Sequence, residues 1–237
     1  MTVAEMNSSS PGHLVVSEVF GPTIQGEGPS AGRRASFVRL GGCNLACSWC
    51  DTPYTWDWSR FERAAELRTL PVEEVARDVR AIAAPLVVIT GGEPLLQRDG
   101  ITNLVELLTA VGHQVEIETN GTIAPHRMQE GVRFNVSPKL ANSGLPEERR
   151  LRPSVLEAFE ATGKAIFKFV VRAPQELDEV EAIVRRHGLS DVWISPEGVV
   201  ADDVIRRSIA LIDGVLTRSW SMSSRLHILL WGDERGR

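Results

Sequence analysis

Three cysteines that stand close together are the residues of this chain best suited to chemistry. Cys43, Cys47 and Cys50 make up its whole cysteine content, and their spacing is C-x3-C-x2-C. Scattered structural thiols would not gather in this way, so the group indicates one site for a soft metal. Thiolates are the usual ligands of iron–sulfur clusters, and a [4Fe–4S] cluster has four irons to ligate. Three cysteines leave one iron open, which predicts a cluster that binds a further molecule and reacts with it.

A structural zinc site is the alternative interpretation of these thiols. Structural zinc is usually held by four protein ligands. The histidine nearest to the motif in sequence, His13, lies thirty residues before Cys43. The spacing therefore favours the redox-active cluster over a zinc site.

Composition and charge exclude several other classes of protein. The 237 residues are 43% hydrophobic and 24% charged, with a net charge of -5, which is typical of a globular protein with a full core. A negative net charge argues against general binding of nucleic acid. An odd number of cysteines argues against a disulfide framework and favours a reducing, cytoplasmic compartment. The sequence has no apolar run near the roughly 20 residues of a membrane span, so we expect no membrane partner.

The chain is predicted to consist of a short tail and a single domain. Residues 1–12 are polar and serine-rich and lack the pattern of a signal peptide, so we expect a flexible tail. Residues 13–237 are expected to form the domain. Within it, residues 52–70 and 140–152 have no regular pattern and are expected to be loops.

Apolar runs and amphipathic segments alternate along the predicted domain. Strands are expected at residues 14–20, 35–40, 86–90, 115–118, 134–137, 166–171, 192–194 and 226–230, and helices at 71–82, 101–111, 177–184 and 202–212. Gly188 is expected to end the third of these helices. Alternating strands and helices predict an α/β fold with mainly parallel strands and right-handed crossovers.

Polar motifs follow several of the predicted strands. They are Thr90-Gly91-Gly92-Glu93-Pro94, Glu118-Thr119-Asn120-Gly121-Thr122, Ser137-Pro138-Lys139 and Ser195-Pro196-Glu197-Gly198. The cysteines follow the predicted strand at 35–40. Because ligands collect at the carboxyl ends of parallel strands, we expect these loops to meet at one mouth.

The cysteine motif, followed by a strand that ends in Gly91-Gly92-Glu93-Pro94, resembles the radical S-adenosylmethionine (SAM) superfamily. The resemblance implies an abbreviated, partial (β/α) barrel. It also implies a [4Fe–4S] cluster whose open iron chelates the amino and carboxylate groups of SAM, so that electron transfer frees a 5′-deoxyadenosyl radical. Glycines without a Cβ atom let the backbone approach a ligand closely.

Further motifs narrow the resemblance. Gln25-Gly26-Glu27, Arg39, Asp51-Thr52 and a late His227, together with the polar motifs above, resemble the 7-carboxy-7-deazaguanine synthase family from about residue 15 to residue 231. The family resemblance implies a carbon–nitrogen lyase of 7-deazapurine (queuosine-type) biosynthesis. It converts 6-carboxy-5,6,7,8-tetrahydropterin to 7-carboxy-7-deazaguanine with loss of ammonia. Hydrogen is abstracted from C6 and later returned, so SAM acts as a true cofactor. The resemblance also implies Mg²⁺, a flavodoxin- or ferredoxin-like electron donor and a homodimer.

The resemblance assigns a role to each matching residue. Cys43, Cys47 and Cys50 would hold the cluster and Thr52 the Mg²⁺. The expected SAM contacts are Trp49, Asp51, Gly92, Glu93, Ser137, Pro138, Lys139 and Ser195, where the family pattern has glutamine at the position of Ser195. The expected substrate contacts are Ile24, Gln25, Gly26, Glu27, Arg39, Thr90 and His227.

Simple chemistry supports several of these roles. A hydroxyl oxygen such as that of Thr52 suits the hard Mg²⁺ ion. The guanidinium of Arg39 fits a carboxylate, and an unpaired charge would be costly in a buried strand. The carboxylate of Glu27 can accept two N–H groups from the pterin edge. His227 is a candidate for catalysis, and an equally good candidate for a structural histidine in a strand.

Two other functions remain open from the sequence. An activase of a glycyl-radical partner would share the cysteine motif but would need neither Thr52 nor Arg39 in these roles. A non-catalytic iron–sulfur electron-transfer protein would hold the cluster without binding SAM.

Overall fold

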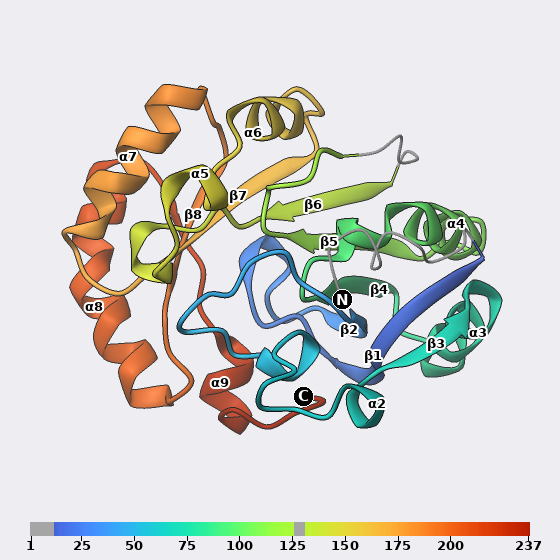
Figure 1. The fold of residues 1–237 in the computed structure, drawn as a ribbon. Helices are drawn as coiled ribbons and strands as arrows, with labels where there is room; N and C mark the ends of the chain where they lie inside the picture. The colour runs from blue at the N-terminus through green and yellow to red at the C-terminus, as the bar shows by residue number, and fades with distance from the viewer. Residues whose placement is uncertain (1–11, 126–130) are drawn as a thin grey trace.

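The computed structural model describes residues 12–125 and 131–237. The predicted tail over residues 1–12 lies outside the described residues except for Gly12. The described strands form one nine-stranded sheet in the order β3-β1-β2-β4-β5-β6-β7-β8-β9, which Figure 1 shows. The strands are β1 (His13–Ile24), β2 (Arg34–Leu40), β3 (Arg68–Pro71), β4 (Leu86–Gly91), β5 (Gln114–Thr119), β6 (Val132–Val136), β7 (Ala165–Val171), β8 (Val192–Pro196) and β9 (Ser221–Met222).

The sheet is mainly parallel, as the alternating pattern predicts. β1 runs antiparallel to β2 and to β3, whereas every pairing from β2 through β9 is parallel. The central strands are buried on both faces; in β4, for example, the side chains of Leu86 through Thr90 are all buried. Continuous apolar strands of this kind are typical of a parallel sheet covered by helices.

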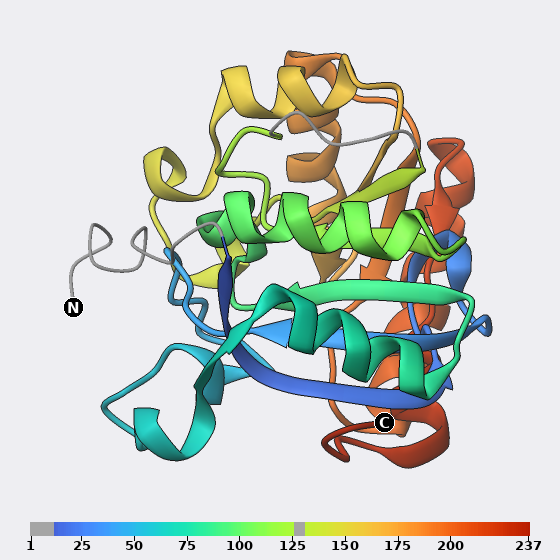
Figure 2. The same cartoon turned by 90° about the vertical axis from the view of Figure 1, so that its right-hand side faces the viewer.

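Helices cover the outer side of this curved sheet, and their buried faces form one apolar core with it (Figure 1). The helices are α2 (Arg63–Glu66), α3 (Val72–Ile82), α4 (Arg98–Thr109), α5 (Glu147–Arg150), α6 (Pro153–Glu160), α7 (Glu176–His187), α8 (Ala201–Thr217) and α9 (Leu226–Trp231). Figure 2 shows α3 and α4, in teal and green, side by side outside the sheet. In α3 the residues Val72, Val75, Ala76 and Val79 are buried, which is the expected helical spacing.

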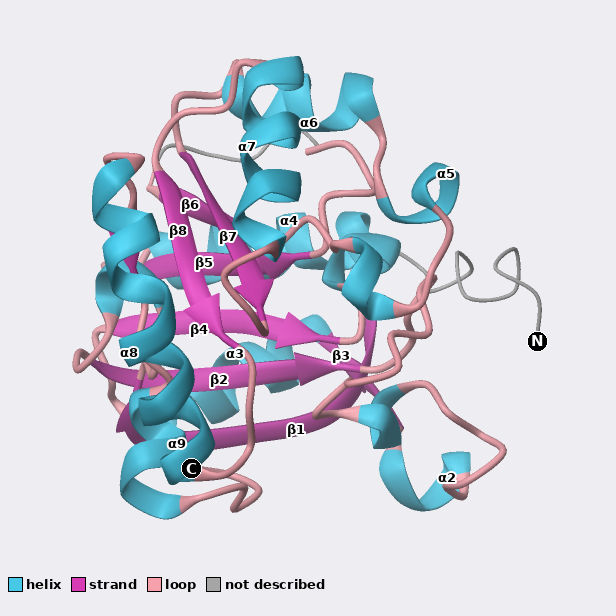
Figure 3. Cartoon of the chain, turned by 90° about the vertical axis from the view of Figure 1, so that its left-hand side faces the viewer, coloured by secondary structure: helices cyan, strands magenta, loops and turns pink. Residues whose placement is uncertain are grey.

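The sheet curves without closing. β3 and β9 stand at the two ends of the strand order, so the described strands form an open, partial barrel. α8 lies outside the sheet against β8 and β9, and α9 lies beside α8 (Figure 3). α7 ends at Gly188, which adopts the left-handed conformation with φ 60°, as predicted for a C-terminal cap.

The last predicted strand is wrong. Residues 226–230 lie in the helix α9, where the amide of Leu229 donates to the carbonyl of Arg225 at 3.1 Å. A short apolar run does not distinguish a strand from a helix by its periodicity. Ile228 is the buried residue of α9, and Gly232 follows the end of the helix with φ 68°.

The segments predicted as loops contain short regular elements. Residues 52–70 include α2 and most of β3, which pairs with β1 from Pro71 opposite His13 to Arg68 opposite Val16. Residues 140–152 include α5. Among the described residues, the helices are too short or too polar to cross a membrane.

Candidate active site

One cavity of about 690 Å³ opens where the strands of the parallel sheet end. It is lined by the three cysteines and by residues from the loops after β4, β5, β6 and β8. Parallel pairing places Arg39 of β2 beside Thr90 of β4, and both line the cavity. The expected mouth of polar loops is therefore present in the fold.

The cysteine loop begins directly after β2 and is tied to its neighbours by backbone hydrogen bonds. Gly42 donates to the carbonyl of Thr55 at 2.7 Å and accepts from the amide of Glu93 at 2.8 Å. Cys43, Cys47 and Cys50 form no disulfide, and all three line the cavity. Three free thiols at one cavity fit the ligand set of an iron–sulfur cluster.

Burial and the neighbouring thiols influence the pKa of Cys43. Burial raises the pKa of the Cys43 thiol to about 12, and the neighbouring thiols of Cys47 and Cys50 act in the same direction. Burial also raises the pKa of Cys47. No three His, Cys, Asp or Glu side chains in the described ranges converge closely enough for a single metal ion. A cubane cluster does not require such convergence because its cysteines ligate separate irons.

The glycine pair after β4 packs against the cysteine loop. A Cβ atom on Gly92 would lie 2.0 Å from the carbonyl oxygen of Gly42, and one on Gly91 would lie 2.1 Å from that of Leu40. Gly91 also has φ 136°, a conformation that favours glycine. The pair therefore allows two backbone segments to meet beside the cysteines.

Glu93 supports this loop from behind and does not line the cavity. Its fully buried carboxylate accepts hydrogen bonds from the amides of Leu95 at 3.0 Å and Asn120 at 2.7 Å and from the hydroxyl of Thr119 at 2.8 Å. Burial raises the pKa of the Glu93 carboxyl despite these hydrogen bonds. Pro138 also does not line the cavity, whereas every other residue with an expected site role does.

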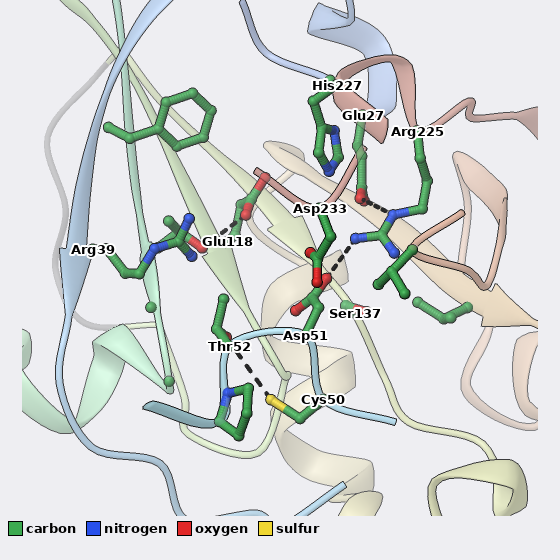
Figure 4. A pocket seen from close by; sticks show the side chains of 18 of the residues that line it. Glu27, Arg39, Cys50, Asp51, Thr52, Glu118, Ser137, Arg225, His227 and Asp233 are labelled. Carbon is green, nitrogen blue, oxygen red and sulfur yellow. Dashed lines mark hydrogen bonds and ion pairs between the residues drawn. The ribbon is translucent and has the colours of Figure 1, made fainter. Parts of the chain in front are cut away.

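A chain of ion pairs crosses the cavity (Figure 4). Glu27 pairs with Lys168 and, at 2.9 Å, with Arg225, which reaches Asp51 at 2.5 Å. Burial would raise the pKa of Glu27, but Lys168 and Arg225 outweigh it and hold that pKa far below its usual range. Burial likewise opposes ionisation of Asp51, and the adjoining Arg225 nevertheless lowers its pKa. Arg225 also donates to the carbonyl of Gly198 at 2.6 Å, so it joins three loops around the cavity.

A second polar group lies toward β1 and β2. Glu118 accepts from the side-chain Nε2 of Gln25 at 3.0 Å and from the hydroxyl of Thr90 at 2.8 Å. Arg39 donates through Nε to Glu18 at 2.9 Å. These contacts fix Gln25, Thr90 and Arg39 at the cavity wall beside the Ile24–Glu27 segment.

His227 reaches the cavity from α9 and not from a strand. A Cβ atom on Gly26 would lie 1.9 Å from Nδ1 of His227, and the amide of Leu226 donates to the carbonyl of Gly26 at 2.9 Å. Burial lowers the pKa of His227, although Glu27 acts in the opposite direction. Gly26 therefore lets the imidazole lie directly against the loop predicted to contact the pterin.

The remaining expected residues lie around the cysteine loop. Lys139 donates to the hydroxyl of Ser137 at 2.9 Å and stands 5.5 Å from the ring centre of Trp49. Ser195 is buried, and its hydroxyl has no hydrogen-bond partner in the described structure. The hydroxyl of Thr52 is 3.8 Å from the sulfur of Cys50.

Several residues at or beside the cavity have no role predicted from the sequence. They are Glu18 of β1, which holds Arg39, and the lining residues Lys168, Arg225 and Gly232–Arg237. Glu118 also lines the cavity; its motif was expected at the mouth, but no role was predicted for its side chain. Lys168 carries a recognisable signal, since it is a charge in the otherwise apolar strand β7. Arg225 lies directly before the apolar run at residues 226–230 and two residues from His227. The tail residue Arg235 pairs with Glu18 and Glu66 and lies 4.0 Å from the ring centre of Tyr54.

Comparisons with known proteins identify the family of the chain. Residues 37–192 match the Radical SAM superfamily. The 7-carboxy-7-deazaguanine synthases of Hyperthermus butylicus and Pyrobaculum aerophilum are 39% and 36% identical to the chain, over 92% and 94% of it and 92% and 96% of their own lengths. The crystal structure of QueE from Escherichia coli superposes with a TM-score of 0.72 at 24% identity and covers 96% of this chain and 99% of that one.

A partial barrel with three cysteines at the carboxyl ends of its strands defines a radical SAM protein. Members of this superfamily use a [4Fe–4S] cluster and SAM. Within the superfamily, the chain belongs to the 7-carboxy-7-deazaguanine synthase family.

Proposed function

We propose that this protein is a carbon–nitrogen lyase that converts 6-carboxy-5,6,7,8-tetrahydropterin to 7-carboxy-7-deazaguanine with loss of ammonia. The observation that carries the proposal is the shared cavity. The three cysteines, Arg39 and the Gln25–Glu27 segment come from separate parts of the chain and line one space. This shared lining supports a cluster and a carboxylated heterocycle bound in one space.

Cys43, Cys47 and Cys50 would hold the cluster, which together with SAM supplies the 5′-deoxyadenosyl radical. We assign the walls beside this loop to SAM, with Trp49, Asp51, Gly92, Ser137, Lys139 and Ser195 as the contacts that line the cavity. Glu93 lies behind this wall, and its role would be to order the backbone of the glycine pair. Pro138 would likewise act through the loop in which it lies.

The opposite wall suits the pterin. Arg39 contacts Glu18 through Nε. Its two terminal nitrogens make no hydrogen bond to described residues. A free guanidinium edge can hold the substrate carboxylate through two parallel hydrogen bonds. Gln25, Glu27, Thr90 and His227 supply acceptors and donors for the edge of the ring.

We assign Mg²⁺ to the space beside Thr52. Its hydroxyl lies at the cavity between the cysteine loop and the wall that carries Arg39. Mg²⁺ prefers oxygen ligands and retains several waters, so substrate oxygens and water would complete its coordination. Thr52→Ala is expected to raise the Mg²⁺ concentration needed for half-maximal turnover, while Thr52→Ser keeps it near the wild-type value. Equal Mg²⁺ dependence in all three proteins would remove Thr52 from the metal site.

We further propose that the protein works in the cytoplasm as a homodimer and takes its electron from a flavodoxin- or ferredoxin-like donor. Three free thiols suit a reducing compartment. Support for a second copy comes from α8, where Ile205, Ile209 and Leu216 are 48%, 70% and 64% exposed. With Ile212 they recur at intervals of four, three and four residues, the spacing by which one helix packs along another.

The first experiment is anaerobic reconstitution with iron and sulfide, followed by assay with SAM, dithionite, Mg²⁺ and the carboxylated pterin. We expect a product with the mass of 7-carboxy-7-deazaguanine and regenerated SAM. Cys47→Ala is expected to bind no cluster and form no product, with Ser48→Ala as the matched control. Cleavage of SAM without this product would agree with membership of the superfamily and contradict the proposed substrate. An intact cluster that cleaves no SAM would overturn the reaction.

A further inference from the structure

Trp56 contacts the cysteine motif, and the proposed reaction assigns no role to this contact. Its indole Nε1 donates a hydrogen bond to the sulfur of Cys50 at 3.3 Å. The direction of the bond is fixed, since an indole N–H can only donate. Trp56 is half-buried and lines the same cavity as the three cysteines.

The local fold holds the indole in this position. Trp56 follows the short 3-10 helix η2 (Pro53–Thr55), and its amide donates to the carbonyl of Pro53 at 3.1 Å. The hydroxyl of Thr55 donates to the carbonyl of Thr52 at 2.8 Å. The carbonyl of Thr55 accepts from the amide of Gly42 at 2.7 Å. The turn that carries Trp56 is thus attached to the cysteine loop on both sides of the motif.

The three sulfurs differ in their donors. The amide of Leu45 reaches the sulfur of Cys43 at 3.5 Å, and the backbone amide of Cys47 acts on its own sulfur. The sulfur of Cys50 has two side-chain contacts, with the hydroxyl of Thr52 at 3.8 Å and with the indole of Trp56 at 3.3 Å. The contact from Trp56 is the shorter one, and its direction is fixed.

We propose that Trp56 is a positioning residue that tunes the cluster through this N–H to sulfur hydrogen bond. The proposal rests on the proposed function in that Cys50 is taken as a cluster ligand. When the cluster accepts one electron from the reductant, its sulfurs become more negative. A hydrogen-bond donor stabilises that reduced state and raises the reduction potential. Trp56 would thereby ease reduction of the cluster by its electron donor, the step that precedes SAM cleavage.

The test is a redox titration of reconstituted Trp56→Phe and wild-type protein with dithionite, followed by electron paramagnetic resonance in the absence of substrate. Phenylalanine retains an aromatic ring and removes the N–H group, so we expect a more negative potential at equal iron content. Trp58→Phe, in the same loop, is the matched control and is expected to keep the wild-type potential.

If Trp56→Phe does not assemble a cluster, benzothienylalanine at position 56 replaces the indole by a ring of nearly the same shape without the N–H donor. An unchanged potential in a variant with a complete cluster would overturn the role of Trp56 and leave the proposed function standing. Failure of the wild-type protein itself to bind a cluster would overturn both.

Discussion

Glu18 and Arg39 face each other across the antiparallel pair β1 and β2, and Nε of Arg39 donates to Glu18 at 2.9 Å. The carboxylate of Glu18 also accepts from the hydroxyl of Tyr54 at 3.3 Å and pairs with Arg235 of the C-terminal tail. Glu18 therefore orients the guanidinium that we assign to the substrate carboxylate and joins it to the tail that lines the cavity.

Replacement of Arg39 is expected to weaken substrate binding. A charge-assisted hydrogen bond contributes roughly 1.5–3 kcal/mol, so Arg39→Ala should raise KM for the pterin by about 10- to 150-fold. Glu18→Gln retains the arginine and loosens its orientation, so its KM should rise by less. Steady-state kinetics at saturating SAM would measure both. An unchanged KM in Arg39→Ala would remove this residue from the substrate site.

Gly92→Ala is expected to prevent assembly of the cysteine site. The added Cβ would lie 2.0 Å from the carbonyl oxygen of Gly42, and backbone cannot move aside as a flexible side chain can. Iron content after reconstitution is the measurement, with Gly12→Ala as the control because no atom lies within 4 Å of a Cβ there. Normal iron content in Gly92→Ala would contradict the close packing of the two loops.

Glu27→Gln is expected to lower stability in a manner that depends on pH. Loss of one partner of a buried ion pair costs about 3 kcal/mol, and Lys168 and Arg225 both pair with Glu27. Because the folded-state pKa of Glu27 is lowered, its contribution is fully present above the unfolded value of about 4.3. It is lost as the pH falls through the folded-state pKa.

The difference in unfolding free energy between wild type and Glu27→Gln should therefore be constant near neutral pH and shrink below about pH 4.3. Denaturant titrations from pH 3 to pH 8 would measure it. Glu74→Gln is the control, since Glu74 forms a largely exposed pair with Arg77 at 3.7 Å. Such pairs contribute little. A difference that does not vary with pH would contradict the lowered pKa.

Ile209→Arg is expected to convert the proposed dimer to a monomer. Ile209 is 70% exposed, so a charge there should disturb the packing of a second helix along α8 and leave the protomer folded. Analytical ultracentrifugation across a range of concentrations would measure the change. Val111→Arg, at a position 55% exposed beyond α4, is the control. A wild-type protein that remains monomeric throughout would refute the dimer.

The sequence determined the chemistry of the centre and the class of fold. The spacing of Cys43, Cys47 and Cys50 and the glycine pair at Gly91 and Gly92 are local patterns, so they can be recognised without coordinates. The parallel strands were also predictable, because apolar runs buried on both faces have a composition of their own. The apolar run at residues 226–230 was ambiguous, since so short a run has no periodicity that distinguishes the six-residue helix from a strand.

The tertiary structure alone decided which distant residues share the cavity. Lys168 and Arg225 are 141 and 198 residues from Glu27 in sequence, and no local pattern can specify that such charges pair. Trp56 and Cys50 are close in sequence, yet their spacing alone does not predict their contact. The turn at Pro53–Thr55 brings the indole to the sulfur. Glu93 is the converse case: its motif pointed to a ligand contact, and burial shows a carboxylate that orders the backbone of the loop. Hydrogen bonds and ion pairs depend on positions in space, and those are fixed only once the sheet has brought its strand ends together.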